Sequence, residues 1–592
     1  MFKDIKHIYK AIGFVWNSSK KYTILQCLLI FFQALLPLIN LFVLKQLIDT
    51  ITHQTNLSST NTNEILYYVI LMGSILLLTN IVSITSQYIS VAQSQRVSDY
   101  MSTLLQEKSV EIDLQFYEDA AYHDTLHRAQ QEGLYRPIAI LKSLISIFQN
   151  GLSITAIAVL FVLLHWGIAV VFILTALPAF FIKIYYSKVL FNWKRETTQL
   201  ERESRYLNKL VTHQEHVKEM RVFDVSHIFI KKFKALRIRL FGEKMGIEGK
   251  RARAEAISRT VETVATISIY GFVAFRAASG NITIGDFVLY FQAFQKGQVA
   301  LKATLVSLAG LYENRLFLQY IFEFLQIKPV VNNPVNPMPL PTINQSITFQ
   351  NVHFTYPSSR NEIEVLKDIN LEFKKGQVIA LVGENGSGKT TLIKLLSRLY
   401  DVSKGSILFD GKDIKDLNIS DVRQKISIIF QDFSKYDLSV TDNVTISNMH
   451  EPIDLEKVKE AVKNTKADQF INDLPDQYDN LLGLQFRKGT ELSGGQWQKI
   501  ALARAFYKKA DIIVLDEPTS AIDPLAEHAI FEKFQEGAKN NILILITHRL
   551  YNLKMADQII VMEKGEVIEV GKHDALVQQK GKYFKMFEKQ MN

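Results

Sequence analysis

Long apolar runs alternate with basic segments through the first half of the chain. The clearest runs, each about as long as a bilayer-spanning helix, lie near Ile24 to Leu44, Ile65 to Ile84, Leu144 to Leu164 and Gly167 to Ile184. Two further runs, Thr260 to Ala277 and Ile284 to Leu311, contain more polar residues. The short sequence Ser279-Gly280-Asn281 separates them and suits a tight hairpin. The pattern predicts six membrane-spanning helices.

The distribution of basic residues predicts the orientation of these helices. Lys and Arg are concentrated between the second and third runs and between the fourth and fifth. The opposite connections, Thr50 to Asn63, His165 to Trp166 and Ser279 to Asn281, contain none. Cytoplasmic loops carry the excess of Lys and Arg. We therefore expect the chain to cross the cytoplasmic membrane with both termini in the cytoplasm. The first run is too long for a cleavable signal and is expected to be a span surrounded by lipid.

Two turning points within the basic segments combine aromatic and acidic residues. They are Phe116-Tyr117-Glu118-Asp119 and Val222-Phe223-Asp224-Val225. The flanking sequences have helical periodicity, so the spans are expected to continue as long helices into the cytosol. Each turning point suits a short helix that fits a groove on another domain, and an ordinary capped turn is the alternative.

Polar residues occupy one face of the last apolar run. These residues are Gln292, Gln295, Lys296, Gln298 and Lys302. A lysine near the middle of a bilayer costs about 2.5 to 3.5 kcal/mol, so we expect Lys296 to line a cavity for water or cargo. Lys302 lies nearer the cytosolic end, where its ammonium group can instead extend to the membrane interface.

A proline-rich segment, residues 328–344, separates residues 1–327 from a second domain, residues 345–592. Prolines at this density cannot continue a helix. Short β-rich runs then alternate with helical stretches, as in a mixed α/β fold. The sequence thus predicts an all-α, six-helix transmembrane domain followed by an α/β domain. The composition agrees, with 48% apolar and only 21% charged residues.

A phosphate-binding loop follows the apolar strand Val378 to Val382. It consists of Gly383, Glu384, Asn385, Gly386, Ser387, Gly388, Lys389 and Thr390, followed by Thr391 at the start of a helix. In such P-loops, backbone N–H groups surround the phosphates, the lysine reaches the β and γ oxygens, and the hydroxyl ligates Mg²⁺. We therefore expect ATP and Mg²⁺ here, and an α/β P-loop ATPase domain.

Further strands end in residues that suit ATP hydrolysis. Asp516 and Glu517 follow Ile512 to Leu515, which places a magnesium-binding acid beside a group that polarises water. His548 follows the strand Ile542 to Ile546 and is expected to contact the γ-phosphate. Gln431 follows Ile428 to Phe430 and can reach both Mg²⁺ and the attacking water, and Tyr356 can stack on adenine.

Together with these residues, the sequence Leu492-Ser493-Gly494-Gly495-Gln496 and the segment Ser520 to Asp523 resemble an ABC transporter nucleotide-binding domain. With the six spans, the chain resembles an exporter half-transporter. The resemblance implies domain-swapped helical bundles and a site completed across two copies. Ser493, Gly494 and Gly495 would contact nucleotide held by the other copy's phosphate loop, and Gln496 and Asp523 are further candidate nucleotide-binding residues. No site residue is degenerate, so we expect a homodimer, with a heterodimer as the alternative.

A narrower resemblance concerns the cargo. Gly483 and Phe486 before the signature, Trp497-Gln498 after it, and Gln431-Asp432-Phe433 with Tyr436 are similar to bacterial exporters of lantibiotics and other ribosomal peptides. Gln485 stands where those exporters have an aromatic residue. Only about twenty residues precede the first span, so we expect export without trimming by an attached peptidase. The expected function is ATP-driven export of a modified ribosomal peptide.

Other functions remain open at this point. A flippase or exporter for a lipid, glycolipid or drug is the alternative within transport, and a channel or regulator is a more distant one. The six spans exclude a soluble ABC ATPase that acts on DNA or ribosomes. We therefore relate the net charge of +9 to the position of Lys and Arg beside the membrane, and we expect no nucleic-acid partner.

Cys27 is the single cysteine, so the chain cannot form an intrachain disulfide.

Overall fold

The structure of the protein is a computed structural model. It describes residues 2–57, 62–119, 126, 129, 136–164, 166–340, 343–357, 363–517, 522, 524–547 and 553–591. The chain forms two compact units. The first unit contains residues 1–110 and 124–327, and the second contains residues 111–123 and 328–592. The residues around Glu111 to Asp119, which the sequence placed with the transmembrane domain, therefore pack with the second unit.

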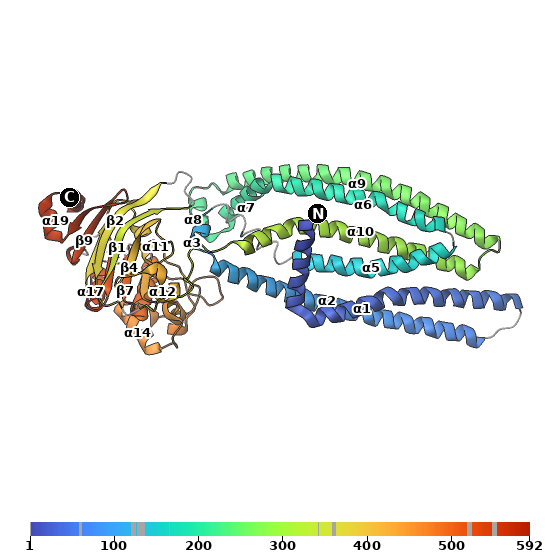
Figure 1. The fold of residues 1–592 in the computed structure, drawn as a ribbon, viewed down its shortest axis with the longest axis horizontal. Coiled ribbons are helices and arrows are strands. Elements are labelled where there is room, and N and C mark those ends of the chain that lie inside the picture. Colours follow the sequence, from blue (N-terminus) through green and yellow to red (C-terminus); the bar gives the residue numbers. More distant parts are fainter. Residues whose placement is uncertain are drawn as a thin grey trace. The chain divides into compact units, whose positions relative to one another are not determined.

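The first unit consists of long helices (Figure 1). They are α1 (Phe2–Leu57), α2 (Thr62–Glu111, which ends at the second unit), α5 (Arg136–Leu164), α6 (Trp166–Glu196), α7 (Thr198–Thr212), α8 (Gln214–Val222), α9 (Ser226–Ala278) and α10 (Ile284–Gln326). Among the described residues, five of them are long and apolar enough to cross a membrane: α1, α2, α5, α6 and α9. Helices α2 and α9, of 50 and 53 residues, continue well past the length of a bilayer-spanning helix, as the sequence predicted.

Helix α10 forms over the expected sixth span but is not among those five. Three of its polar residues form hydrogen bonds or an ion pair with residues of neighbouring helices. Gln298 donates to the hydroxyl of Thr266 (2.8 Å), and Lys296 donates to the carbonyl of Pro37 (3.3 Å). Lys302 forms an ion pair with the nearly buried Glu262 (2.7 Å), a partner that the sequence did not predict. That α10 crosses the membrane stays a prediction.

An aromatic cluster joins α5, α6 and α10. The ring of Phe161 lies 5.4 Å from that of Phe172 and 5.8 Å from that of Phe294, and all three side chains are buried. Such pairs contribute about 0.5 to 1.5 kcal/mol beyond the burial of their area. At the far end of this bundle, the predicted hairpin Ser279 to Asn281 connects α9 to α10, and Thr283 begins α10 with a capping box to Asp286.

The described residues of the second unit form two β-sheets covered by helices (Figure 1). The first, in the order β2-β1-β4-β5, is antiparallel and consists of β1 (Ser346–Thr355), β2 (Glu364–Lys374), β4 (Lys404–Phe409) and β5 (Lys412–Asp413). The second, in the order β10-β9-β3-β8-β7-β6, consists of β3 (Val378–Val382), β6 (Ile426–Ile429), β7 (Ile512–Asp516), β8 (Ile542–Ile546), β9 (Gln558–Glu563) and β10 (Glu566–Gly571).

All neighbouring pairs in the second sheet are parallel except β9 with β10. Strands β3, β7 and β8 are buried along their whole length, which explains their unbroken aliphatic sequences. Parallel strands direct their carboxyl ends to one edge of the sheet, where ligands bind in α/β proteins. The helices of this unit are α3 (Leu114–Tyr117), α11 (Lys389–Leu396), α12 (Ile419–Gln424), α13 (Val440–Thr445), α14 (Leu455–Asn464), α15 (Asp468–Ile471), α16 (Gly494–Lys508), α17 (Pro524–Ala538), α19 (His573–Gln579) and α20 (Lys582–Met591).

Candidate nucleotide site

A cavity of about 330 Å³ lies at the carboxyl edge of the parallel sheet, at the ends of β3 and β7. Its lining includes the predicted residues Tyr356, Asn385, Gly386, Ser387, Gly388, Lys389, Thr390, Thr391, Gln431, Asp516 and Glu517. Val365 and Ile546 complete the lining and were not predicted. The fold thus brings together residues that are separated by more than a hundred positions in the chain.

The phosphate loop connects β3 to α11 through a backbone that only glycine adopts easily. Gly388 has φ of +105°, and a Cβ there would approach Leu366 Cδ2 to 2.6 Å. The buried ammonium group of Lys389 donates to the carbonyls of Gly383 (2.7 Å) and Glu384 (3.1 Å). Burial lowers the pKa of Lys389, while the charges of Glu517 and Asp516 oppose this effect. The lysine is therefore held inside the loop that would receive phosphates.

Strand β7 places two acids in different environments. Asp516 is buried (4% exposed), and its Oδ2 accepts a hydrogen bond from the Thr390 hydroxyl (3.3 Å). Burial raises the pKa of Asp516 to about 6, with a further contribution from the charge of Glu517. Glu517 has φ of +44°, a conformation that non-glycine residues rarely adopt and that recurs at functional sites. This turn presents the Glu517 carboxylate to the cavity, where Gln431 Nε2 donates to its Oε2 (3.0 Å).

The oxygen atoms gathered here suit Mg²⁺. Thr390 Oγ1 and Asp516 Oδ2 are already in contact, and the amide oxygen of Gln431 belongs to the same cavity. Hydroxyl, carboxylate and amide oxygens are the hard ligands that Mg²⁺ prefers, in a site that it usually shares with phosphates and water. The donor set therefore fits the ion.

Tyr356, the predicted adenine-stacking residue, also lines the cavity. Its hydroxyl is 3.0 Å from the hydroxyl of Thr391, and its ring packs edge-on against Phe354 and Tyr400. The ammonium group of Lys394, on α11, lies 5.5 Å from the centre of the Tyr356 ring. The predicted adenine-stacking residue therefore contacts two residues of α11, the helix that begins at the end of the phosphate loop.

The signature residues lie outside this cavity. Ser493 begins α16, and its capping box with Gln496 fixes the start of the helix. Ser493 and Gly494 are exposed, and neither these two nor Gly495 and Gln496 line the cavity. Two other predicted site residues, His548 and Asp523, fall outside the described part of the chain.

Arg504 is a buried residue outside the cavity lining whose contacts the sequence did not indicate. From α16 its guanidinium donates to the carbonyls of Asn443 (2.8 Å) and Ser434 (2.9 Å) and lies over the ring of Tyr436. It connects the signature helix to the segment that follows Gln431. The sequence around Arg504 does not indicate these contacts, because the partner residues lie 61 and 70 positions away.

The short helix α3, at the first turning point, contacts the nucleotide-binding fold. Leu114 packs against the core between the sheets, and Asp113 accepts a hydrogen bond from the backbone N–H of Val331 (3.2 Å). Glu118 forms an ion pair with Lys394 (2.6 Å) and accepts a hydrogen bond from the Tyr400 hydroxyl. The helix is therefore fixed by its core contact and by charge.

A cavity lined by a phosphate loop at the edge of a parallel sheet, helices apolar enough to cross a membrane, and the signature Leu492 to Gln496 are together what is expected of an ABC transporter. The sequence matches the ABC transporter family over residues 366–520. The chain is 31% identical to the subtilin transport ATP-binding protein SpaT of Bacillus subtilis over 562 residues, which cover 94% of this chain and 89% of that protein. It is 30% identical to the nisin transport ATP-binding protein NisT of Lactococcus lactis over 587 residues, 98% of this chain and 95% of that protein.

The chain belongs to the ABC transporter family, and its relatives extend over nearly its whole length. A solved structure of a bacterial Atm1-family ABC exporter with ATP bound superimposes with a TM-score of 0.82 over 97% of this chain and 98% of that one, at 20% identity. The protein is accordingly a multi-pass membrane exporter that binds nucleotide and couples ATP hydrolysis to transport. It has the fold of a half-transporter, a class that generally works as a dimer.

Proposed function

We propose that this protein exports a modified ribosomal peptide from the cytoplasm across the cytoplasmic membrane, as a homodimer with both termini in the cytoplasm. The observation that carries the proposal is the end-to-end similarity to transporters of subtilin and nisin. The residues around the signature agree with it, because Gly483, Phe486 and Trp497 have the spacing typical of that group.

In this proposal each chain contributes a complementary half of two nucleotide sites. The phosphate loop and Lys389 hold the phosphates of ATP, and Tyr356 stacks on the adenine. The exposed Ser493 and Gly494, with Gly495, Gln496 and Asp523, face the γ-phosphate bound by the other copy. Thr390, Asp516 and Gln431 would hold Mg²⁺, which neutralises phosphate charge when bound.

Hydrolysis in this proposal depends on a general base at the end of β7. Glu517 polarises the attacking water, Gln431 orients it through their hydrogen bond (3.0 Å), and His548 contacts the γ-phosphate. Closure of the two domains over ATP would open the membrane helices outward, and hydrolysis would reset them.

Inverted membrane vesicles test this function. Vesicles containing the wild-type protein should accumulate a fluorescent lantibiotic-type peptide in the presence of ATP, whereas vesicles containing Glu517→Gln should not. Translocation of a fluorescent phospholipid without accumulation of peptide would replace the proposal with a lipid flippase. Copurification of tagged with untagged copies tests the homodimer, and labelling of terminal tags from each side of the membrane tests the orientation.

A further inference from the structure

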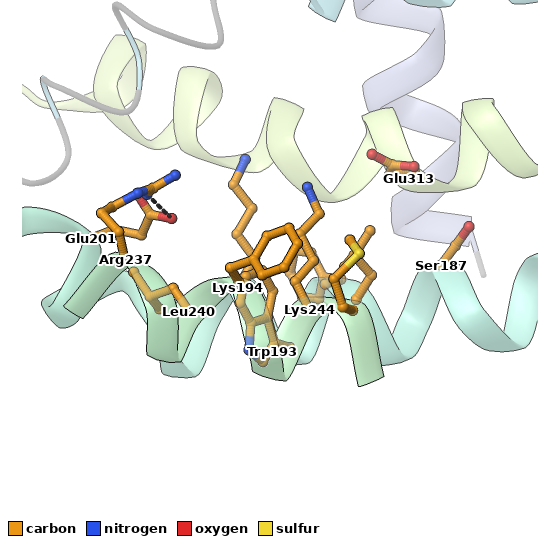
Figure 2. Close-up of a pocket in the computed structure, with 12 residues that line it drawn as sticks. Ser187, Trp193, Lys194, Glu201, Arg237, Leu240, Lys244 and Glu313 are labelled. Atoms are coloured by element: carbon orange, nitrogen blue, oxygen red, sulfur yellow. Dashed lines mark ion pairs between the residues drawn. The ribbon is translucent and has the colours of Figure 1, made fainter. Parts of the chain in front are cut away.

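The side chain of Lys582 connects the phosphate loop to the C-terminal helix α20. Its ammonium group lies 3.0 Å from the carboxylate of Glu384, in the phosphate loop, and 2.7 Å from that of Glu563, at the end of β9. By contrast, Glu201 and Arg237 of the first unit form a pair of one acid and one cation, 3.7 Å apart (Figure 2). Lys582 thus joins three separate segments of the second unit.

Backbone contacts fix the position of Lys582 at the start of α20. The carboxylate of Glu569, on β10, accepts hydrogen bonds from the backbone N–H groups of Lys582 and Tyr583. Gly581 leaves room for this carboxylate, because a Cβ there would approach its Oε1 to 2.1 Å. The Tyr583 side chain is buried, and its hydroxyl is 2.7 Å from Nδ1 of His573. The start of the helix is therefore held without the ion pairs of the Lys582 side chain.

Glu384 is held through its backbone as well as its side chain. Its carbonyl oxygen accepts hydrogen bonds from the backbone N–H of Ser387 (3.1 Å) and from the ammonium group of Lys389 (3.1 Å). Its side chain is 70% exposed and does not line the nucleotide cavity. Glu384 is therefore part of the loop that would hold phosphates, while its carboxylate is directed to Lys582 outside the cavity.

The charge of Glu384 opposes the binding of a triphosphate. Like charges repel, and the repulsion is stronger near a protein surface than in bulk water. The hydrogen bonds with Glu563 and Glu384 raise the pKa of the Lys582 ammonium group, so it stays a cation at neutral pH and offsets the charge of Glu384. Without Lys582, the negative charges of Glu384 and Glu563 would both remain beside the phosphate loop.

The backbone of the phosphate loop has support that does not depend on Lys582. Gly565, in the turn between β9 and β10, donates its N–H to the carbonyl of Ser387 (3.2 Å). Gly383 lies against β9, where a Cβ would approach the carbonyl oxygen of Met562 to 2.2 Å. Loss of the Lys582 side chain should therefore change the charge at the loop and leave its fold intact.

We propose that Lys582 is a positioning residue for ATP, which acts by holding the Glu384 carboxylate outside the cavity and offsetting its charge. The affinity for ATP thereby depends on the start of the C-terminal helix, a segment that lies outside the cavity lining. The inference rests on the phosphate loop as the proposed nucleotide site and extends that site to α20.

The ATPase of the full-length protein in nanodiscs, measured as a function of ATP concentration, tests this role. Lys582→Met should raise KM for ATP about threefold, the effect of losing one partly exposed ion pair. The loss should appear in KM more than in kcat, because Glu517 and Gln431 are untouched. Lys582→Arg keeps the positive charge and should restore most of the affinity. The matched control is Lys585→Met, an exposed lysine of the same helix, which should have the KM of the wild type.

A double-mutant cycle with Glu384 separates this role from a general effect on α20. In the Glu384→Gln background, Lys582→Met should raise KM little further, because the carboxylate on which it acts is gone. An equal rise in KM in both backgrounds would overturn the inference. So would a wild-type KM in Lys582→Met, or a defect in Lys582→Arg as large as that in Lys582→Met.

Lys389→Ala keeps this test distinct from that of the nucleotide site itself. Calorimetry should show that this variant loses most of its binding of Mg²⁺-ATP, since the ammonium group inside the phosphate loop is removed. Wild-type binding in Lys389→Ala would remove the proposed nucleotide site. A loss in Lys389→Ala, together with wild-type binding in Lys582→Met, would remove only the role of Lys582.

Discussion

Glu118 and Lys394 form an ion pair in which 2.6 Å separates the carboxylate from the ammonium group. Glu118 directly follows α3, and α3 follows the long apolar helix α2 in the chain. Lys394 lies on the helix after the phosphate loop and also contacts the rings of Tyr356 and Tyr400. Burial and the charge of Glu118 both raise the pKa of Tyr400 far above its ordinary range, so its hydroxyl stays a donor. Lys394 thus contacts both Glu118, at the end of α3, and the ring of Tyr356, the predicted adenine-binding residue.

Removing this charge should weaken the link between transport and hydrolysis. Glu118→Gln is expected to reduce the ratio of cargo-stimulated to basal ATPase by about fivefold, the lower end of typical coupling between sites. Lys394→Met should act in the same way, and the double variant should be no worse than either single one. ATPase assays with and without cargo measure the ratio. Additive losses in the double variant would show that the two residues act separately.

Glu517 is expected to carry the hydrolytic step. Glu517→Gln should lower the ATPase rate about a hundredfold or more, because the general base is lost. Binding of ATP and ATP-dependent pairing of copies should persist, since the phosphate loop is untouched. The control is Glu460→Gln, which removes an exposed acid that pairs with Lys509 and does not line the cavity. A Glu517→Gln protein that turns over at the wild-type rate would exclude this role.

The raised pKa of Asp516, about 6, predicts a pH dependence near neutrality. In the metal-free protein the protonated carboxyl predominates below this pH, so magnesium-dependent ATP binding should weaken between pH 7 and 5.5. The same pKa shift affects folding stability in the opposite direction, because it favours the folded state at low pH. A carboxyl whose pKa rises on folding stabilises the fold at low pH, and this contribution is lost as the pH rises through about 6.

Titration of ATP binding by calorimetry at several pH values, with and without Mg²⁺, measures the first effect. Asp516→Asn should bind Mg²⁺-ATP weakly at every pH and lose the pH dependence. An unchanged pH profile in this variant would assign the titration to another group.

The ion pair between Lys302 and Glu262 should stabilise the first unit, and removal of either partner alone should destabilise it. Breaking a buried pair by removing one partner typically costs about 3 to 5 kcal/mol, whereas replacing both by apolar residues is often neutral. Because Lys302 remains about half exposed, Lys302→Met should lie below this range. Glu262→Leu/Lys302→Met, which replaces both partners by apolar residues, should recover most of the loss. Thermal unfolding in detergent measures the effect, and equal melting temperatures for the single and double variants would contradict it.

The buried strands were predictable because the residues that define each of them are consecutive in the sequence. Val378 to Val382 and Ile542 to Ile546 match β3 and β8 residue for residue, since a strand covered on both faces requires an unbroken aliphatic run. The residues of the phosphate loop were predictable for a similar reason, because glycine spacing and a preceding strand define it.

Contacts across the sequence were not predictable. Glu118 and Lys394 are 276 positions apart, and nothing near either residue specifies the other. The antiparallel sheet was recognised only at Ile347 to Phe349, because β2 and β4 mix polar and apolar residues on their two faces. The acidic partner of Lys302 was missed because Glu262 lies inside another apolar helix, where the sequence alone does not show which face meets α10.

The hydrogen bond between Tyr356 and Thr391 makes recognition of the two ends of a nucleotide interdependent. In the proposed site, a triphosphate bound by the phosphate loop would compete for the Thr391 hydroxyl, and the tyrosine ring would then be released to stack on a base. A free adenosine offers no phosphate to break this bond. The protein should therefore discriminate strongly between nucleoside and nucleotide, even though both carry the same purine.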